Sequence, residues 1–197
     1  MGKAGGRVRG RPQTATAGAL VLALTACASG PAPQVYDLSP AQPPRARPLH
    51  AQISIAQPVA TLDLDSESVL VRTTPMTLAT LPQARWPQSL TLLFRARLVA
   101  SLQNAGLTRY LAAGGATADY QLNLDIRSFE LDAQRSEAHI DIAATIVSTA
   151  SGRIAAVDIF DTTVPVAATD ASNVVPALDK AAAIVMTKIV AFVAKSI

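Results

Sequence analysis

The clearest structural signal in this chain lies in residues 120–164, YQLNLDIRSFELDAQRSEAHIDIAATIVSTASGRIAAVDIFDTTV. Apolar and polar residues alternate over 120–126 and again over 137–146, which is the two-residue period of strands that bury one face. A third strand is expected over 154–164, after a turn-like segment that contains glycine. Loops this short cannot form parallel crossovers, so the three strands are predicted to form an antiparallel meander.

Shorter strands are expected upstream of the meander. Residues 52–59 are in near alternation and 68–72 form a short apolar run, so both are predicted to be strands. Residues 35–38 also alternate and could pair as a short edge strand. Residues 76–86 are expected to be irregular, because proline interrupts this segment and also flanks it. Within the meander the apolar residues change phase near Ser128, which predicts a β-bulge there.

Two helices are predicted where the apolar period changes to about four. The first covers 90–102, where a large apolar residue recurs at every fourth position between Pro87 as a start signal and Gly106 as a stop. The second covers 172–194 and carries a buried apolar stripe. Lys180, Lys188 and Lys195 mark its solvent-exposed side. The sum is an α+β fold, a single domain in which two long helices pack on one face of a mainly antiparallel sheet.

The beginning of the chain carries the pattern of an export signal. Four cationic side chains precede an uncharged stretch, residues 14–26, that contains an apolar run. This stretch is only about half of the roughly 20 apolar residues that a membrane-spanning helix needs, so residues 1–26 are predicted to be a cleaved signal peptide. The tetrapeptide Leu24-Thr25-Ala26-Cys27 resembles the lipobox of bacterial lipoproteins. In that class the thiol of the cysteine is joined to diacylglycerol, and the peptide is cut before it.

Cleavage before Cys27 would change the charge of the protein. The sequence has 17 Lys and Arg against 14 Asp and Glu, and the signal holds four of the cations and none of the acids, so the mature chain has a formal charge of −1. Binding of nucleic acid through bulk charge is therefore not expected. Cys27 is the only cysteine, so no disulfide can form. Residues 27–50 are rich in proline and are predicted to be a lipidated, semi-rigid tether, with 51–197 as the domain.

No catalytic constellation is visible in the sequence. The chain contains no Gly-x-Ser-x-Gly elbow, no Walker A loop and no Gly-x-Gly-x-x-Gly fingerprint. Glu137, His139 and Asp141 share one predicted strand face, but neighbours two positions apart on a strand lie about 6.8 Å apart, an awkward spacing for a shared metal ion. These three residues are interpreted as a solvated face. Enzymatic activity, a bound metal and a cofactor are therefore not expected.

Several short motifs occur in an order that is informative as a whole. They are the lipobox, Tyr36-Asp37-Leu38, Arg85-Trp86 just before the first helix, the predicted strand 158–166 and the terminal helix. Together they resemble the family of ABC-type transport auxiliary lipoproteins, over essentially all of the mature chain. The resemblance implies an outer-membrane lipoprotein that serves an intermembrane lipid transport system, with an MCE-domain protein and the permease and ATPase of an ABC transporter as partners. One departure is Val71-Arg72, which stands where the family pattern has an aromatic residue.

The resemblance implies a non-enzymatic component of that system, anchored in the outer membrane and facing the periplasm. Ala28 agrees with this location, because an Asp directly after the lipidated cysteine commonly retains a lipoprotein at the inner membrane. The residues by themselves indicate only an exported lipoprotein with a small α+β domain. Two other functions stay open: a structural or assembly lipoprotein that tethers an envelope complex, and an exported hydrolase.

Two places are predicted to contact partners. Arg85 and Trp86 combine a cation with an aromatic ring, as interface hot spots often do, and could face a partner, although the favoured interpretation is that Trp86 caps the core beneath the helix start. The terminal helix is apolar over more of its circumference than one sheet face can cover. Val190 and Val193 are therefore predicted to contact a second surface, either another copy of the chain or the MCE-domain partner.

Overall fold

The computed structural model describes residues 1–2, 5–6, 32–112 and 116–197. The chain divides into two units, Met1–Gly30 and Pro31–Ile197, and the α+β domain lies in the second. Cys27 and Ala28, on which the predicted lipidation and sorting depend, lie outside the described residues. None of the helices in the described ranges combines the length and the apolar character that a membrane crossing requires.

The domain is built on a mixed sheet. Within the described residues its strands are β1 Gln34–Val35, β2 Ile53–Ile55, β3 Val59–Ala60, β4 Ser68–Thr74, β5 Thr77–Arg85, β6 Tyr120–Asp132, β7 Glu137–Ser148 and β8 Ile154–Pro165. The path through the sheet is β1-β5-β4-β6-β7-β8, and β2 and β3 also pair with β6. Strands β6, β7 and β8 form the predicted antiparallel meander. Strands β2, β3 and β4 run parallel to β6, so the sheet is mostly antiparallel with some parallel pairs.

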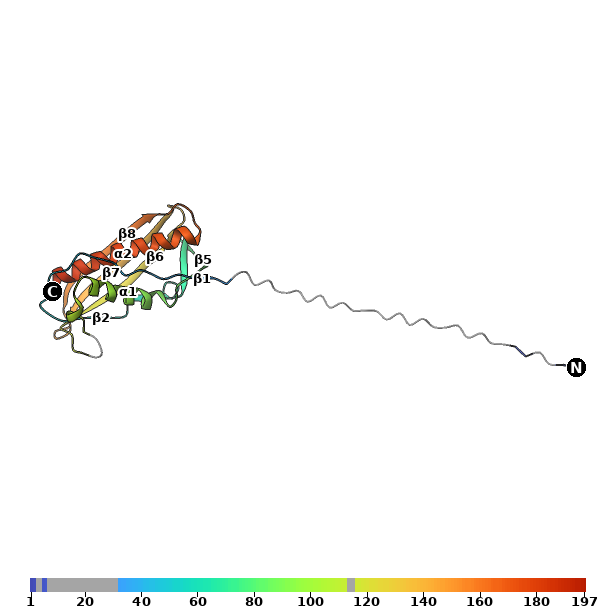
Figure 1. Ribbon diagram of the computed structural model, residues 1–197, viewed down its shortest axis with the longest axis horizontal. Coiled ribbons are helices and arrows are strands. Elements are labelled where there is room, and N and C mark those ends of the chain that lie inside the picture. The colour runs from blue at the N-terminus through green and yellow to red at the C-terminus, as the bar shows by residue number, and fades with distance from the viewer. Residues whose placement is uncertain (3–4, 7–31, 113–115) are drawn as a thin grey trace. The chain divides into compact units, whose positions relative to one another are not determined.

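Two helices cover one face of this sheet, and the predicted α+β class is confirmed (Figure 1). Their bounds are α1 Leu90–Asn104 and α2 Ala171–Ser196, and a short 3-10 turn, η1, covers Thr108–Tyr110. The chain leaves α1 through Gly106 at φ +85°, a left-handed conformation that glycine adopts without strain. At the start of α2, the Asp170 carboxylate accepts a hydrogen bond from the Ser172 backbone N–H at 3.0 Å.

The core lies between the two helices and the sheet. The rings of Trp86 and Phe94 both meet Phe129 edge to face, with centroids 6.0 and 6.4 Å apart. The β6–β7 register shifts between Ile126 and Ser128, which confirms the predicted bulge. Because one extra residue reverses the alternation of a strand, this bulge turns Phe129 toward the helices.

Residues 77–85 form strand β5, so the prediction of an irregular segment over 76–86 is wrong. The β4–β5 register shifts between Ser68 and Leu70, and this bulge leaves Pro82 at a place where its missing N–H removes no ladder hydrogen bond. Gln83 adopts φ 60° in the same bulge. The single strand predicted over 52–59 is also divided, into β2 and β3.

Candidate functional surface

The proline-rich segment that was expected to be a tether lies against the domain for much of its length. Residues 37–47, which we call the strap, pass along α1 and α2 (Figure 1). Leu38 and Ala41 of the strap and Leu49 just beyond it are buried in the hydrophobic core. The strap is extended, as its proline content predicts, but it is packed on the helices rather than free.

Hydrogen bonds fix the strap to both helices. The Ser39 N–H donates to the Asp179 carboxylate of α2 at 2.6 Å. The Ala41 N–H donates to Ser101 Oγ of α1 at 2.8 Å, and Asn104 Nδ2 donates to the Ala41 carbonyl oxygen at 2.9 Å. Because the backbone polar groups of Ala41 are both satisfied by α1, this part of the strap can be buried without an unpaired donor or acceptor.

The strap begins at an ion pair between Asp37 and Arg97. The hydrogen bond from the Arg97 guanidinium is the main reason why the pKa of the Asp37 carboxyl lies below its ordinary value. A lowered carboxyl pKa stabilises the fold above the unfolded-state pKa of about 3.9, and this stabilisation is lost as pH falls through the lower folded-state pKa.

We expect NMR titration of Asp37 to give a midpoint below about 3.9, and Arg97→Gln to raise that midpoint. An unchanged midpoint in Arg97→Gln would contradict the role of this pair.

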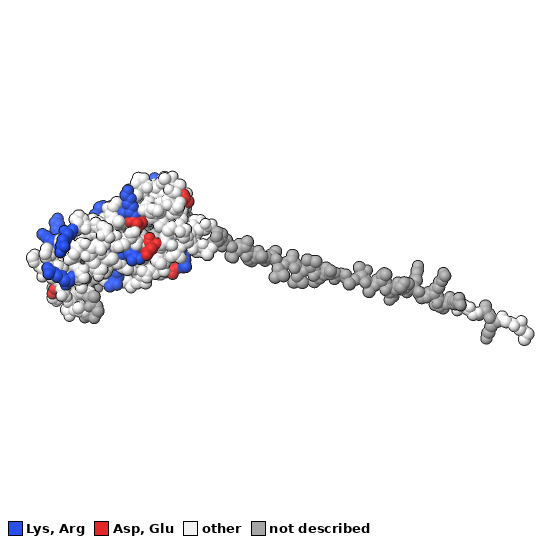
Figure 2. Space-filling view, viewed as in Figure 1, with Lys and Arg blue, Asp and Glu red and all other residues white. Residues whose placement is uncertain are grey.

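Positive charge gathers at the end of the domain where α2 stops (Figure 2). The Arg47 guanidinium donates to the carbonyl oxygens of Ala194 at 2.6 Å and Lys195 at 3.0 Å, so it caps the last turn of α2. A groove between the strap and α2, here called the basic groove, is lined by strap residues 43–47 and by Thr187, Val190, Ala191, Ala194 and Lys195. Arg45 also lines an adjoining hollow with Arg109. Among the residues that the structure describes, no Asp or Glu side chain lines either depression.

The structure corrects the prediction for the terminal helix. Val190 and Val193 are only 2% and 0% exposed within this single chain, so neither side chain is available to a partner. Val190 lines the basic groove together with strap residues 43–47. The strap therefore covers part of the apolar surface of α2 that the sheet leaves uncovered. The second surface predicted to contact this helix comes, in part, from the same chain.

Arg85 and Trp86 have different environments. Trp86 is 1% exposed and packs against Phe129, so its predicted partner contact is wrong, and the alternative of a ring that caps the core is confirmed. The Arg85 side chain is 46% exposed and donates from Nη1 to the Glu67 carboxylate at 2.8 Å. Arg85 alone stays a prediction as a partner contact at this corner.

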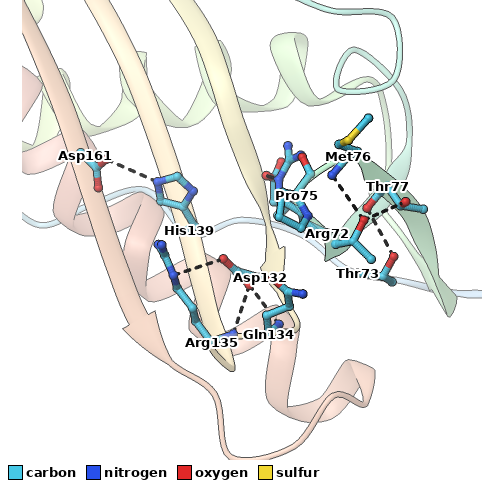
Figure 3. Close-up of polar contacts among 12 residues, drawn as sticks. Arg72, Thr73, Pro75, Met76, Thr77, Asp132, Gln134, Arg135, His139 and Asp161 are labelled. Carbon is cyan, nitrogen blue, oxygen red and sulfur yellow. Dashed lines mark hydrogen bonds and ion pairs between the residues drawn. The ribbon is translucent and has the colours of Figure 1, made fainter.

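His139 and Asp141 of β7 each pair with a side chain on a neighbouring strand. His139 turns toward Asp161 of β8, with 3.4 Å between Nε2 and the carboxylate (Figure 3). The Asp141 carboxylate accepts a hydrogen bond from the Arg127 guanidinium at 2.5 Å, which is the main cause of the raised pKa of Arg127. Among the described residues there is no group of three or more His, Cys, Asp or Glu side chains that could hold a metal ion.

Arg72, the residue at the departure from the family pattern, pairs with a buried carboxylate. Glu130 is buried, and its Oε1 accepts a hydrogen bond from Arg72 Nε at 2.6 Å. Its Oε2 has no hydrogen-bond partner within the described part of the chain. Removing Arg72 would leave a buried charge uncompensated, so the physical role of this arginine is structural.

The comparisons with known proteins agree with the fold and with the motifs. The family model for the ABC-type transport auxiliary lipoprotein component matches residues 36–190. This match identifies a transport-associated lipoprotein. The chain belongs to the ABC-type transport auxiliary lipoprotein family, as its motif order predicts. The match begins at the start of the strap rather than after it, in agreement with the packing of this segment. No curated protein matches the sequence.

Solved structures share the fold. Protein XCC0632 from Xanthomonas campestris is 27% identical, with a TM-score of 0.75 over 83% of this chain and 96% of its own. An uncharacterised protein is 16% identical, with a TM-score of 0.63 over 84% of this chain and 98% of its own, and it shows the fold alone. PelC from Paraburkholderia phytofirmans, solved as a dodecamer, is 11% identical with a TM-score of 0.43 over 75% of this chain and 90% of its own. That likeness is too low to bear on the assembly of this chain.

Proposed function

We propose that this protein is a lipid-anchored periplasmic component of an intermembrane lipid transport system and performs no chemistry itself. Its partners would be an MCE-domain protein and the permease and ATPase of an ABC transporter. The observation that carries the proposal is the family match over residues 36–190 in a chain that also has a lipobox ending at Cys27. Because the chain has no Walker A loop, the energy for transport would come from the ATPase subunit.

The proposed location is the inner face of the outer membrane. Six residues separate Cys27 from Gln34, where β1 begins, and the seven Cα–Cα steps between these two residues reach at most about 25 Å. The β1 end of the domain would therefore stay near the membrane. The strap leads from β1 along α2 to Arg47 at the last turn of that helix. The basic groove would then face the periplasm rather than the anchoring membrane.

Immunoprecipitation of the untagged protein from detergent-solubilised envelopes tests the partners. We expect the MCE-domain protein, the permease and the ATPase to be enriched together, and to be absent from the same precipitation in a deletion strain. Exchange of isotope-labelled phospholipid between the two membranes should also slow in the deletion strain. Recovery of envelope structural proteins without any transporter subunit, with unchanged lipid exchange, would favour the structural or assembly lipoprotein instead.

A further inference from the structure

The basic groove combines two features that suit an anionic amphiphile. Its volume is about 420 Å³, within the usual range of small-molecule sites. Its apolar walls are formed by Pro43, Pro44 and Ala46 on the strap and by Val190, Ala191 and Ala194 on α2. We propose that this groove binds a molecule with an alkyl chain and an anionic head group, the chemistry of an anionic phospholipid, with the chain along α2 and the head at Arg45 and Lys195.

The shape of the groove favours an alkyl chain. On α2, Val190 and Ala191 lie three and four residues after Thr187, and Ala194 lies four and three residues after them, so the four residues form a row about 10 Å long on one side of the helix. The strap runs along the opposite wall. Ala191 is exposed and carries only a methyl group, which keeps the groove open to solvent at that point. A narrow apolar row of this kind fits an extended chain.

The walls of the groove are fixed in the absence of a ligand. Arg47 donates to the carbonyl oxygens of Ala194 and Lys195, at 2.6 and 3.0 Å. The Ala46 N–H donates to the carbonyl oxygen of Ala105, the residue that follows α1, at 3.0 Å. These bonds hold the strap against both helices on either side of the groove. Ligand binding therefore requires little additional ordering of the polypeptide, and this favours a higher affinity.

The charges at the groove select the head group. Arg45, Arg47 and Lys195 line it, and no carboxylate side chain from the described part of the chain does. Arg47 uses its donors on the helix carbonyls, whereas the Arg45 side chain passes over Gly106 and has no hydrogen bond or ion pair within the described residues. A guanidinium in this position can bind a phosphate or carboxylate through two parallel hydrogen bonds.

The hollow on the other side of α2 is a poorer site for an anion. It has a volume of about 540 Å³, lies between α2 and β8, and shares Ala191 and Lys195 with the basic groove. Its lining also contains Asp158, whose carboxylate would repel an anionic head group. We therefore place the ligand on the strap side of the helix.

The biological meaning of this site rests on the proposed function, because a lipid transport component is the kind of protein that meets such ligands. The binding itself rests only on the groove. An immunoprecipitate without transporter subunits would overturn the proposed function and leave the measured affinities unchanged. Absence of binding would overturn the site and leave the partners unchanged.

Isothermal titration of the full mature chain carrying Cys27→Ser, purified without detergent, tests the site. The probes are palmitoyl lysophosphatidylglycerol, palmitoyl lysophosphatidylcholine and glycerol phosphate, with both lipids kept below their critical micelle concentrations. We expect the anionic lipid to bind at least about tenfold tighter than the zwitterionic one. Glycerol phosphate, which has the charge and no chain, should bind at least about tenfold more weakly than the anionic lipid.

Substitutions at Ala191 and Arg45 distinguish the contribution of the alkyl chain to binding from that of the head group. Ala191→Phe fills the groove and should weaken both lipids by about tenfold or more. Arg45→Glu should remove the preference for the anionic lipid and leave the affinity for the zwitterionic lipid unchanged, whereas Arg45→Lys should keep part of the preference. Ile184→Phe is the matched control, because Ile184 is exposed on the same helix and does not line the groove. Circular dichroism would establish that each variant is folded.

Three results would overturn the proposal. The first is that the anionic lipid gives no heat of binding. Equal affinity for glycerol phosphate would indicate a site for free anions only. Equal loss of affinity in Ala191→Phe and Ile184→Phe would place the lipid elsewhere on the domain.

Discussion

Replacing Cys27 by Ser is expected to release the protein from the membrane completely. Cys27 is the only cysteine and the predicted acceptor of the lipid. Each buried methylene of an attached acyl chain contributes about 0.8 kcal/mol to membrane binding, so two or three chains make the attachment stable and none leaves it without an anchor. Mass spectrometry of the wild type should show the acyl groups, and Cys27→Ser should appear without them in the soluble periplasmic fraction.

Density-gradient fractionation in the same experiment tests the sorting prediction. The wild type, with Ala28 after the lipidated cysteine, should move with the outer membrane, and Ala28→Asp should shift to the inner membrane while it keeps its acyl groups. Wild-type protein in the soluble periplasm without acyl mass would exclude the lipoprotein interpretation. Wild type and Ala28→Asp together in the inner membrane would exclude the outer-membrane location.

Elements whose signal is local could be predicted from the sequence. The β6–β7–β8 meander is encoded by alternation within each strand and by short turns, and the bulge near Ser128 by a change of phase. Strand β5 could not be predicted in the same way. Proline has no backbone N–H and normally interrupts a strand, unless, as at Pro82, a bulge leaves that position without a ladder hydrogen bond. That bulge depends on pairing with β4, and pairing between strands is not visible in the pattern of either one.

The candidate surface was missed because extended segments carry no helical or strand period. Residues 43–47 contain two prolines and two arginines, and this pattern predicts a solvated spacer as readily as a wall of a groove. The position of Arg47 depends on the last turn of α2, about 150 residues later in the chain. The spacing of Arg45 and Arg47 by two positions in an extended segment was the available signal, since it places both side chains on one side.

The burial of Val193 predicts the largest effect on folding. Val193 is fully buried in α2, and a glutamate there would place a carboxylate among apolar side chains without a partner. We expect Val193→Glu to lower the free energy of unfolding by more than about 4 kcal/mol, a large part of the roughly 5–15 kcal/mol that stabilises a domain. Urea denaturation followed by circular dichroism would measure the loss.

Ile184→Glu provides the matched control. Ile184 lies on the same helix but is 36% exposed, so a glutamate there can keep its charge in water, and the free energy of unfolding should change by less than about 1 kcal/mol. The comparison separates burial of a charge from the higher helix propensity of glutamate and the added negative charge, which both substitutions share. If Val193→Glu were as stable as Ile184→Glu, the strap and the sheet would not enclose α2, and Val193 would again be available to a second copy or a partner.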